Sequence, residues 1–344
     1  MKNYLDYTVN ILQELLEIPS PSGDTSKIIE VVRRNFMDLG LKTKVNVKNN
    51  LLVEVKGEIE DKIKVVSAHV DTLGAMVKEI KSNGRLKLSQ IGGYSWNSIE
   101  GENCIISTLE GKKYTGTILF EKTSVHNYGV ISKEEKREEK NMEVRIDELV
   151  YSKESVEELG INVGDFIYFN PRTELTSSGF IKSRHLDDKV SVAIILGVCK
   201  YIVENKIKPK YTINFLISNY EEVGHGITIL PNNTFEILAI DMASPGEGQT
   251  STEETVSICA KDSSGPYDLE LRKRLVELAK DEGIDYKIDI YNYYSSDASS
   301  AIKSGNVVRH GLIGAGVDSS HGYERTHKNG ILNTIKLLQR YIEE

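Results

Sequence analysis

The sequence predicts an α/β protein in which a mixed sheet lies between helical layers, with a smaller β-rich domain inserted into the chain. Three observations support this. Continuous apolar strands, at residues 64–71, 211–218 and 235–240, are typical of a sheet covered on both faces. Amphipathic helical segments lie between such strands. Residues 76–170 instead have short alternating runs and many glycines. We therefore expect a discontinuous main domain at 1–75 and 171–344 and an inserted β-rich domain at 76–170.

The individual elements follow from periodicity and from breakers. The first helix has apolar residues at helical spacing and stops at the turn Pro19-Ser20-Pro21, and Gly40 ends the second helix. Strands 42–47 and 51–55 come next. In the second half, the predicted helices and strands alternate as α/β units do. The helices are expected at 4–17, 24–39, 190–203, 267–282, 298–303 and 331–342, and the later strands at 286–291 and 307–313.

Composition excludes several classes of function. The 344 residues carry a net charge of −8 with no basic tract, so we expect no nucleic-acid partner. The chain has no apolar run near about 18 residues, so we expect no membrane partner. The N-terminus lacks the apolar core of a signal peptide, and the three cysteines are widely spaced in apolar runs. These features indicate a cytoplasmic protein with buried thiols.

One polar stretch directly precedes the most apolar helix. Ser183-Arg184-His185-Leu186-Asp187-Asp188-Lys189 leads into residues 190–203. In the simplest interpretation, Asp187 and Asp188 only cap this helix and place charge in its first turn. The alternative is that an acid held there uses its two oxygens to bridge two cations.

Other potential ligands favour the second interpretation. Several apolar strands are followed by a histidine or an acid, and sites in α/β sheets form at the carboxyl ends of strands. Singly, each of these side chains has a structural explanation, such as a capped turn or a solvated rim. Together, three carboxylates and two imidazoles suit two zinc-like ions about 3.5–4 Å apart, and Co²⁺ or Mn²⁺ would also fit. The predicted ligands are His69, Asp187, Glu222, Asp241 and His321.

Glu221 and Glu222 are adjacent acids after the strand 211–218. Neighbouring residues at a strand end point to opposite sides, so one carboxylate can bind a metal ion while the other faces the water bound there. A carboxylate in that position acts as a general base and passes the proton to a leaving amine. The predicted chemistry is hydrolysis of an amide bond.

The chain resembles the co-catalytic metallo-aminopeptidases of the glutamyl aminopeptidase and tetrahedral (TET) aminopeptidase family. The resemblance spans nearly the whole chain and includes the inserted β domain. It implies a di-metal peptidase domain with a barrel or PDZ-like insertion that mediates dimerisation or larger homo-oligomers, possibly a tetrahedral dodecamer, acting on short peptides. The motifs that carry it are Ala68-His69-Val70-Asp71, Leu186-Asp187-Asp188-Lys189, Glu221-Glu222-Val223-Gly224, Ile240-Asp241 and Ser320-His321.

The resemblance also implies a ligand for each position. Asp187 would bridge two divalent ions. His69 and Asp241 would complete one metal site, and Glu222 and His321 would complete the other.

Further roles are implied around these ligands. Glu221 would be the general base that activates a metal-bridging water, and Asp71 would hold His69 in the correct tautomer. A cis peptide is expected between Asp187 and Asp188. Asp297 matches an acid near the substrate cleft.

The sequence departs from the family pattern at three places. Thr72 stands where an acid is usual, and Arg184-His185 replaces a commoner Lys-Ala pair. The tail 322–327 differs from the usual Ser-Pro-rich segment, and His327 within it is a rival ligand to His321. These differences concern substrate choice more than metal chemistry.

Three other functions compete with the aminopeptidase. A deacylase or carboxypeptidase of the related di-metal amidohydrolases uses a similar ligand set. A glycosidase needs two acids that flank a sugar bond, which adjacent residues of one strand cannot do. A catalytically inactive scaffold would have lost Glu221 or Asp187, and both are present.

Overall fold

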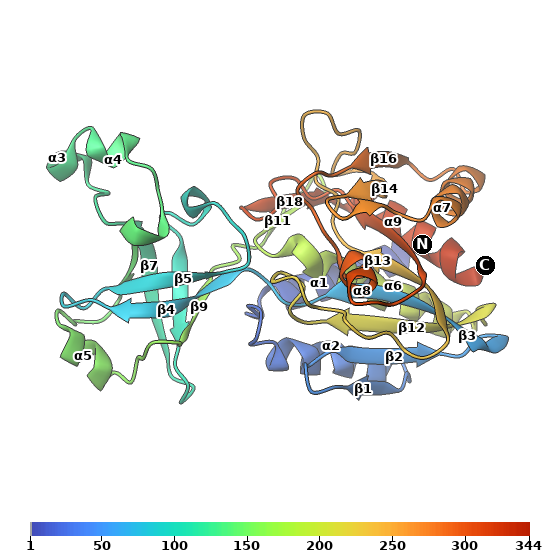
Figure 1. Ribbon diagram of the computed structural model, residues 1–344, viewed down its shortest axis with the longest axis horizontal. Helices are drawn as coiled ribbons and strands as arrows, with labels where there is room; N and C mark the ends of the chain where they lie inside the picture. Colours follow the sequence, from blue (N-terminus) through green and yellow to red (C-terminus); the bar gives the residue numbers. More distant parts are fainter. Residues whose placement is uncertain (1) are drawn as a thin grey trace. The chain divides into compact units, whose positions relative to one another are not determined.

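The computed structural model describes residues 2–344, and the chain forms two compact units (Figure 1). Unit 1 contains Met1–Asp71 and Arg172–Glu344, and unit 2 contains Thr72–Pro171. The first division falls after Asp71, ahead of the expected residue 75, because the chain enters the first strand of unit 2 at Gly74.

Unit 1 is built on a mixed sheet, as the sequence predicts, and this sheet has nine strands. Its strands follow the order β1-β2-β12-β3-β13-β17-β14-β15, with β16 paired to β14. The four central strands, β12, β3, β13 and β17, run parallel. Strands β1 and β2 pair antiparallel with their neighbours, and β14 is antiparallel to β17 and β15 but parallel to β16. The strands are β1 (Thr43–Val45), β2 (Leu51–Val55), β3 (Ile59–His69), β12 (Tyr211–Ser218), β13 (Thr234–Ile240), β14 (Val256–Asp262), β15 (Gly265–Pro266), β16 (Tyr286–Ile290) and β17 (Arg309–Ala315).

Both faces of the central strands are buried, which explains their continuous apolar sequences. In β3, Val66 packs with the larger core cluster and Val65 with the smaller one on the other face. In β13, Leu238 packs with the larger cluster and Ile237 with the smaller one. The alternation of side chains along a strand thus supplies both helical layers with apolar partners.

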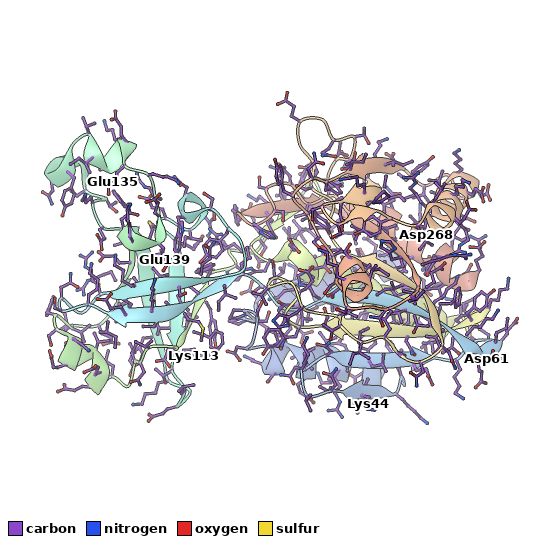
Figure 2. All side chains as sticks on the ribbon, in the orientation of Figure 1. Lys44, Asp61, Lys113, Glu135, Glu139 and Asp268 are labelled. Atoms are coloured by element: carbon purple, nitrogen blue, oxygen red, sulfur yellow. The ribbon has the colours of Figure 1, made fainter. Side chains whose placement is uncertain are left out.

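The helices of unit 1 separate into two layers. The larger core cluster contains buried residues of α1, α2, α6, α7 and α9, whereas α8 contributes to the smaller cluster. Asp268, labelled in Figure 2, begins α7 by accepting the N–H of Leu271 at 2.8 Å. The helices are α1 (Lys2–Leu16), α2 (Ser26–Asp38), α6 (Leu186–Glu204), α7 (Leu269–Asp281), α8 (Asp297–Lys303) and α9 (Lys328–Glu343).

A small three-stranded sheet also belongs to unit 1. It pairs β10 (Glu174–Leu175) with β11 (Phe180–Ser183) and β11 with β18 (Glu324–His327). The register places Ser183 opposite Glu324. This pairing brings the approach to α6 beside the segment that follows His321.

Unit 2 is a closed six-stranded barrel, in agreement with the predicted β-rich insertion. The strands close in the order β4-β5-β8-β7-β6-β9 around a separate apolar core. They are β4 (Gly74–Ile80), β5 (Leu86–Ile91), β6 (Asn103–Ser107), β7 (Lys113–Phe120), β8 (Met142–Ile146) and β9 (Phe166–Phe169), accompanied by the short helices α3 (Val125–Tyr128), α4 (Ile131–Glu134) and α5 (Lys153–Glu158). Across residues 2–344, none of the helices is both long and apolar enough to span a membrane.

Candidate metal centre

The predicted ligands meet at the carboxyl ends of the parallel strands. His69 is the last residue of β3, and Asp241 follows directly after the neighbouring strand β13. Glu221 and Glu222 lie in the turn after β12, on the other side of β3. Because these strands are adjacent and parallel, their ends bring all four side chains to one edge of the sheet.

Asp187 does not cap α6. Asp187 and Asp188 have non-helical backbone angles inside the first turn, a cis peptide joins them, and His185 at the N-cap position makes no side-chain cap. The Asp187 carboxylate accepts the hydroxyl of Ser320 at 3.0 Å. The simple capping interpretation of this acid is therefore wrong, and its carboxylate is free to face the site.

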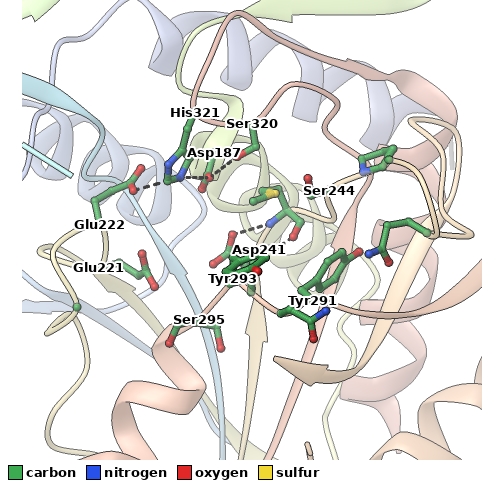
Figure 3. A pocket seen from close by; sticks show the side chains of 18 of the residues that line it. Asp187, Glu221, Glu222, Asp241, Ser244, Tyr291, Tyr293, Ser295, Ser320 and His321 are labelled. Carbon is green, nitrogen blue, oxygen red and sulfur yellow. Dashed lines mark hydrogen bonds and ion pairs between the residues drawn. The ribbon is translucent and has the colours of Figure 1, made fainter. Parts of the chain in front are cut away.

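Two groups of three side chains share Asp187. Figure 3 shows the group that Asp187 forms with Glu222 and His321. Nε2 of His69 lies 3.3 Å from Oδ1 of Asp187, and Nε2 of His321 lies 3.2 Å from Oδ2 of the same residue. Nε2 of His321 is also 3.5 Å from Oε2 of Glu222. Within each group, the potential ligand atoms lie within 4.8 Å of one another. The groups are His69, Asp187 and Asp241, and Asp187, Glu222 and His321.

These groups fit a pair of small divalent ions. Tetrahedral bonds of about 2.0–2.1 Å separate ligand atoms by about 3.3 Å, close to the distances seen here. Oε1 of Glu222 is buried and has no hydrogen-bond partner among the described residues. Buried carboxylates without partners are unfavourable unless a cation neutralises them. The donor set of carboxylates and imidazoles is one that Zn²⁺, Co²⁺ and Mn²⁺ accept.

The titration of the cluster reflects its excess of acids. Burial raises the pKa of Glu221 and of Glu222 well above the usual range, and burial with repulsion from Asp187 raises the pKa of Asp241 to about 7. Burial also opposes ionisation of Asp187, but hydrogen bonds from His321 and His69 outweigh it and hold the pKa of Asp187 below the usual range. Asp187 is thus the acid that keeps its charge.

Asp71 organises the surroundings of the first group. Its carboxylate accepts the backbone N–H of Glu221 at 3.1 Å and of Glu222 at 3.3 Å, and the hydroxyl of Ser22 at 2.5 Å. Nδ1 of His69 lies 2.9 Å from the Asp71 carbonyl oxygen and 3.5 Å from its carboxylate. A carbonyl only accepts, so Nδ1 carries a proton, and Nε2 is the ring nitrogen that faces Asp187.

Glu324 is a residue of the site that the sequence does not predict. This residue is 1% exposed, and its carboxylate accepts the backbone N–H of Asp187 and of His321, each at 3.1 Å. Burial and the neighbouring Asp187 raise the pKa of Glu324 to about 8. The four-residue strand Glu-Arg-Thr-His lacks apolar alternation, so nothing in the sequence predicts that its first residue is buried.

Two further sequence candidates lie outside both groups. Asp297 is buried, accepts the hydroxyl of Ser218 and the N–H of Ile227, and does not line the cavity. It supports the turn that carries the two glutamates. His327 ends β18, where Nε2 lies 2.9 Å from the carbonyl of Ser178 and the ring packs against Phe180. His321, not its rival His327, thus lies beside Asp187.

A cavity of about 800 Å³ opens over the two groups. Its floor includes Asp187, Glu221, Glu222 and Asp241, and its walls come from residues 242–249 and 291–303. Figure 3 shows Glu221 and Glu222 on one side of this cavity and Tyr291 on the other. Room for several residues of a peptide is therefore available beside the acids.

Comparisons with known proteins identify related sequences. Residues 49–337 match the model of the M42 glutamyl aminopeptidase family. YhfE of Bacillus subtilis strain 168, named as a candidate aminopeptidase, is 52% identical over 337 residues, which cover 98% of this chain and 97% of that protein.

Solved structures share the fold. The TET1 peptidase of Pyrococcus horikoshii superposes with a TM-score of 0.86 at 24% identity, over 98% of this chain and 99% of that one. An aminopeptidase of Desulfurococcus kamchatkensis gives a TM-score of 0.88 at 22% identity, over 99% of this chain and 96% of that one. The chain therefore belongs to the M42 glutamyl aminopeptidase family of peptide-bond hydrolases.

Proposed function

We propose that this protein is a di-metal aminopeptidase that removes N-terminal residues from short peptides. The observation that carries the proposal is the position of Asp187, whose two oxygens each face a different ligand group. When bound, two divalent ions would polarise the attacking water and the scissile carbonyl and would offset the negative charge that develops on the carbonyl oxygen.

Five residues would hold these ions. Asp187 would be shared between them, with His69 and Asp241 holding one ion and Glu222 and His321 the other. Zinc is the expected ion, with cobalt or manganese as substitutes, because the set mixes oxygen and nitrogen donors and lacks thiolates.

Glu221 is the proposed general base. It belongs to neither ligand group, yet its Oε2 lies 3.8 Å from Nε2 of His69 and it lines the cavity. Its carboxylate would take a proton from the attacking water and deliver it to the nitrogen of the leaving amine. Burial raises the pKa of Glu221, which brings this acid closer to the pH at which both transfers are efficient.

The charges of the cavity favour a free amine over a free carboxylate. Apart from the proposed metal ligands, its lining includes the acids Glu221 and Glu247, and Lys303 is the one lysine or arginine among the lining residues. Acidic walls attract the protonated N-terminus of a peptide, whereas a carboxypeptidase needs a cation for the terminal carboxylate. Lys303 is exposed, at the end of α8.

The test compares free and blocked substrates. Leucine, glutamate and lysine aminoacyl-anilides are assayed beside N-acylated peptides, with and without a chelator. We expect cleavage of the free-amine substrates, loss of activity in chelator, and recovery when zinc, cobalt or manganese is returned. Cleavage of N-blocked substrates alone would establish a deacylase, and no cleavage of any substrate by the metal-loaded protein would support an inactive scaffold.

We also propose that the chain forms a homo-oligomer through unit 2. The P. horikoshii TET1 peptidase is described as assembling into a tetrahedron or a large octahedral shell. Unit 2 exposes large apolar side chains on and beside its short helices, notably Val130 (63%) and Ile131 (47%). Exposed apolar side chains that lie close together often mark protein–protein contacts.

A further inference from the structure

The three side chains of the group formed by Asp187, Glu222 and His321 come from segments far apart in the sequence. The backbone N–H groups of two of these residues, Asp187 and His321, point to a single buried side chain, that of Glu324. Oε2 of Glu324 accepts the N–H of Asp187 and Oε1 accepts the N–H of His321, each at 3.1 Å. One carboxylate thus fixes the main chain at two of the three ligand positions.

The other group is held by different contacts. The carboxylate of Asp188 accepts the backbone N–H of His69 at 3.2 Å, and the carbonyl of Asp71 lies 2.9 Å from Nδ1 of the same histidine. Asp241 accepts the N–H of Met242. Glu324 therefore contacts only one member of the first group, the shared Asp187.

We infer that Glu324 is a positioning residue that sets the geometry of one of the two metal sites, the site made by Asp187, Glu222 and His321. The inference rests on the proposed di-metal function. A buried N–H group that loses its acceptor is unfavourable, and each oxygen of Glu324 accepts one of these two N–H groups. Residues that orient metal ligands commonly change metal affinity about 10- to 100-fold when they are altered.

A purely structural role for Glu324 would have different consequences. Glu324 also begins β18, and its loss could simply loosen the pairing of β18 with β11. Thr326 lies on the same strand, is fully buried, and donates its hydroxyl to the carbonyl of Gly316 at 2.6 Å. Thr326→Val removes that hydrogen bond without touching a ligand, so it is a matched control for damage to the strand.

The variant of choice is Glu324→Gln, which keeps the volume of the side chain. Its amide oxygen can accept only one of the two N–H groups, and its NH₂ group must face the other donor. Circular dichroism and thermal melts of the metal-free proteins verify that Glu324→Gln and Thr326→Val are folded.

The experiment titrates metal-free protein with Co²⁺ and locates the ions by anomalous diffraction. We expect the wild type to bind two ions. In Glu324→Gln, one affinity should fall about 10- to 100-fold while the other changes less than about threefold, and the ion beside Glu222 and His321 should lose occupancy at limiting cobalt. Thr326→Val should retain both affinities, and excess cobalt should restore the turnover of Glu324→Gln.

Three results would overturn the inference while leaving the di-metal site intact. In the first, wild type and Glu324→Gln bind two ions with the same affinities. In the second, Glu324→Gln weakens the binding of both ions equally. In the third, Thr326→Val reproduces the effect of Glu324→Gln. A wild-type chain that binds fewer than two ions would instead contradict the proposed di-metal site, and the inference with it.

Discussion

The carboxylate of Asp71 accepts the backbone N–H of Glu221 at 3.1 Å. The contact joins the end of β3 to the turn after β12, and the same carboxylate accepts the N–H of Glu222. Asp71 is completely buried, so this hydrogen bonding is shielded from water. The proposed base and a proposed metal ligand are thus placed by one acid.

Asp71→Asn should lower turnover through this placement. Asparagine keeps one acceptor oxygen but presents NH₂ to a backbone donor, so the turn at Glu221 should shift. We expect kcat to fall about 10- to 100-fold, with a smaller change in KM. Steady-state kinetics on an aminoacyl-anilide measure both values. A kcat within twofold of wild type would show that Asp71 does not control the position of the base.

Glu221→Gln should separate chemistry from metal binding. Glutamine cannot take a proton, so kcat should fall by at least about 10²- to 10⁴-fold. The metal content should stay at the wild-type value, because Glu221 belongs to neither ligand group. Elemental analysis beside kinetics provides the measurement, with the exposed surface variant Glu270→Gln as control. Full activity of Glu221→Gln would rule out this assignment of the base.

The oligomer should depend on the apolar surface of unit 2. The double variant Val130→Asp and Ile131→Asp places two charges where a subunit contact would need apolar atoms. Light scattering should show an assembly for the wild type, about 460 kDa if twelve chains of 38.5 kDa associate, and a smaller species for the variant. Val307→Asp, at a 98% exposed position in unit 1, is the control. An unchanged mass for the double variant would place the contact elsewhere.

Lys64 should make stability depend on pH in the alkaline range. The side chain is buried, its ammonium donates to the carbonyl of Tyr341 at 3.1 Å, and burial lowers the pKa of Lys64 to about 8 from 10.5. Between these values the unfolded chain binds the proton and the folded chain does not, so raising the pH stabilises the fold.

The matched comparison is wild type against Lys64→Met in metal-free protein. From pH 8 to pH 10.5, the unfolding free energy of the wild type should rise relative to the variant by up to about 3 kcal/mol. Below pH 8 the difference in unfolding free energy between wild type and variant should not change with pH. Urea unfolding across the range measures it, and parallel pH profiles would contradict the lowered pKa of Lys64.

Much of the fold could be predicted because its signals are local. Apolar strands such as 64–69 and 211–218 can only lie in the middle of a covered sheet, and the change to short alternating runs after residue 76 marks the barrel. The fold class and the family are confirmed. The strand β14, Val256–Asp262, was not expected, because its apolar run is short and follows a polar loop.

The ligands could be predicted, but not their supports. A histidine or an acid at the end of a buried strand is visible in sequence, as for His69 and Asp241. Glu324 is buried only because β18 pairs with β11, and pairing between distant short strands has no local signature. The resemblance implies that Asp71 orients His69, and both its carbonyl and its carboxylate lie near Nδ1; the carboxylate also accepts the N–H of Glu221, which the sequence does not predict. The roles of the ligands and of the base stay predictions.

The most direct test of the central claim is an anomalous difference map from crystals of the zinc-loaded protein. The di-metal account predicts two peaks about 3.5–4 Å apart, both bound by Asp187, one beside His69 and Asp241 and the other beside Glu222 and His321. A map at saturating zinc with no peak at Asp187, or with a single peak there, would contradict it.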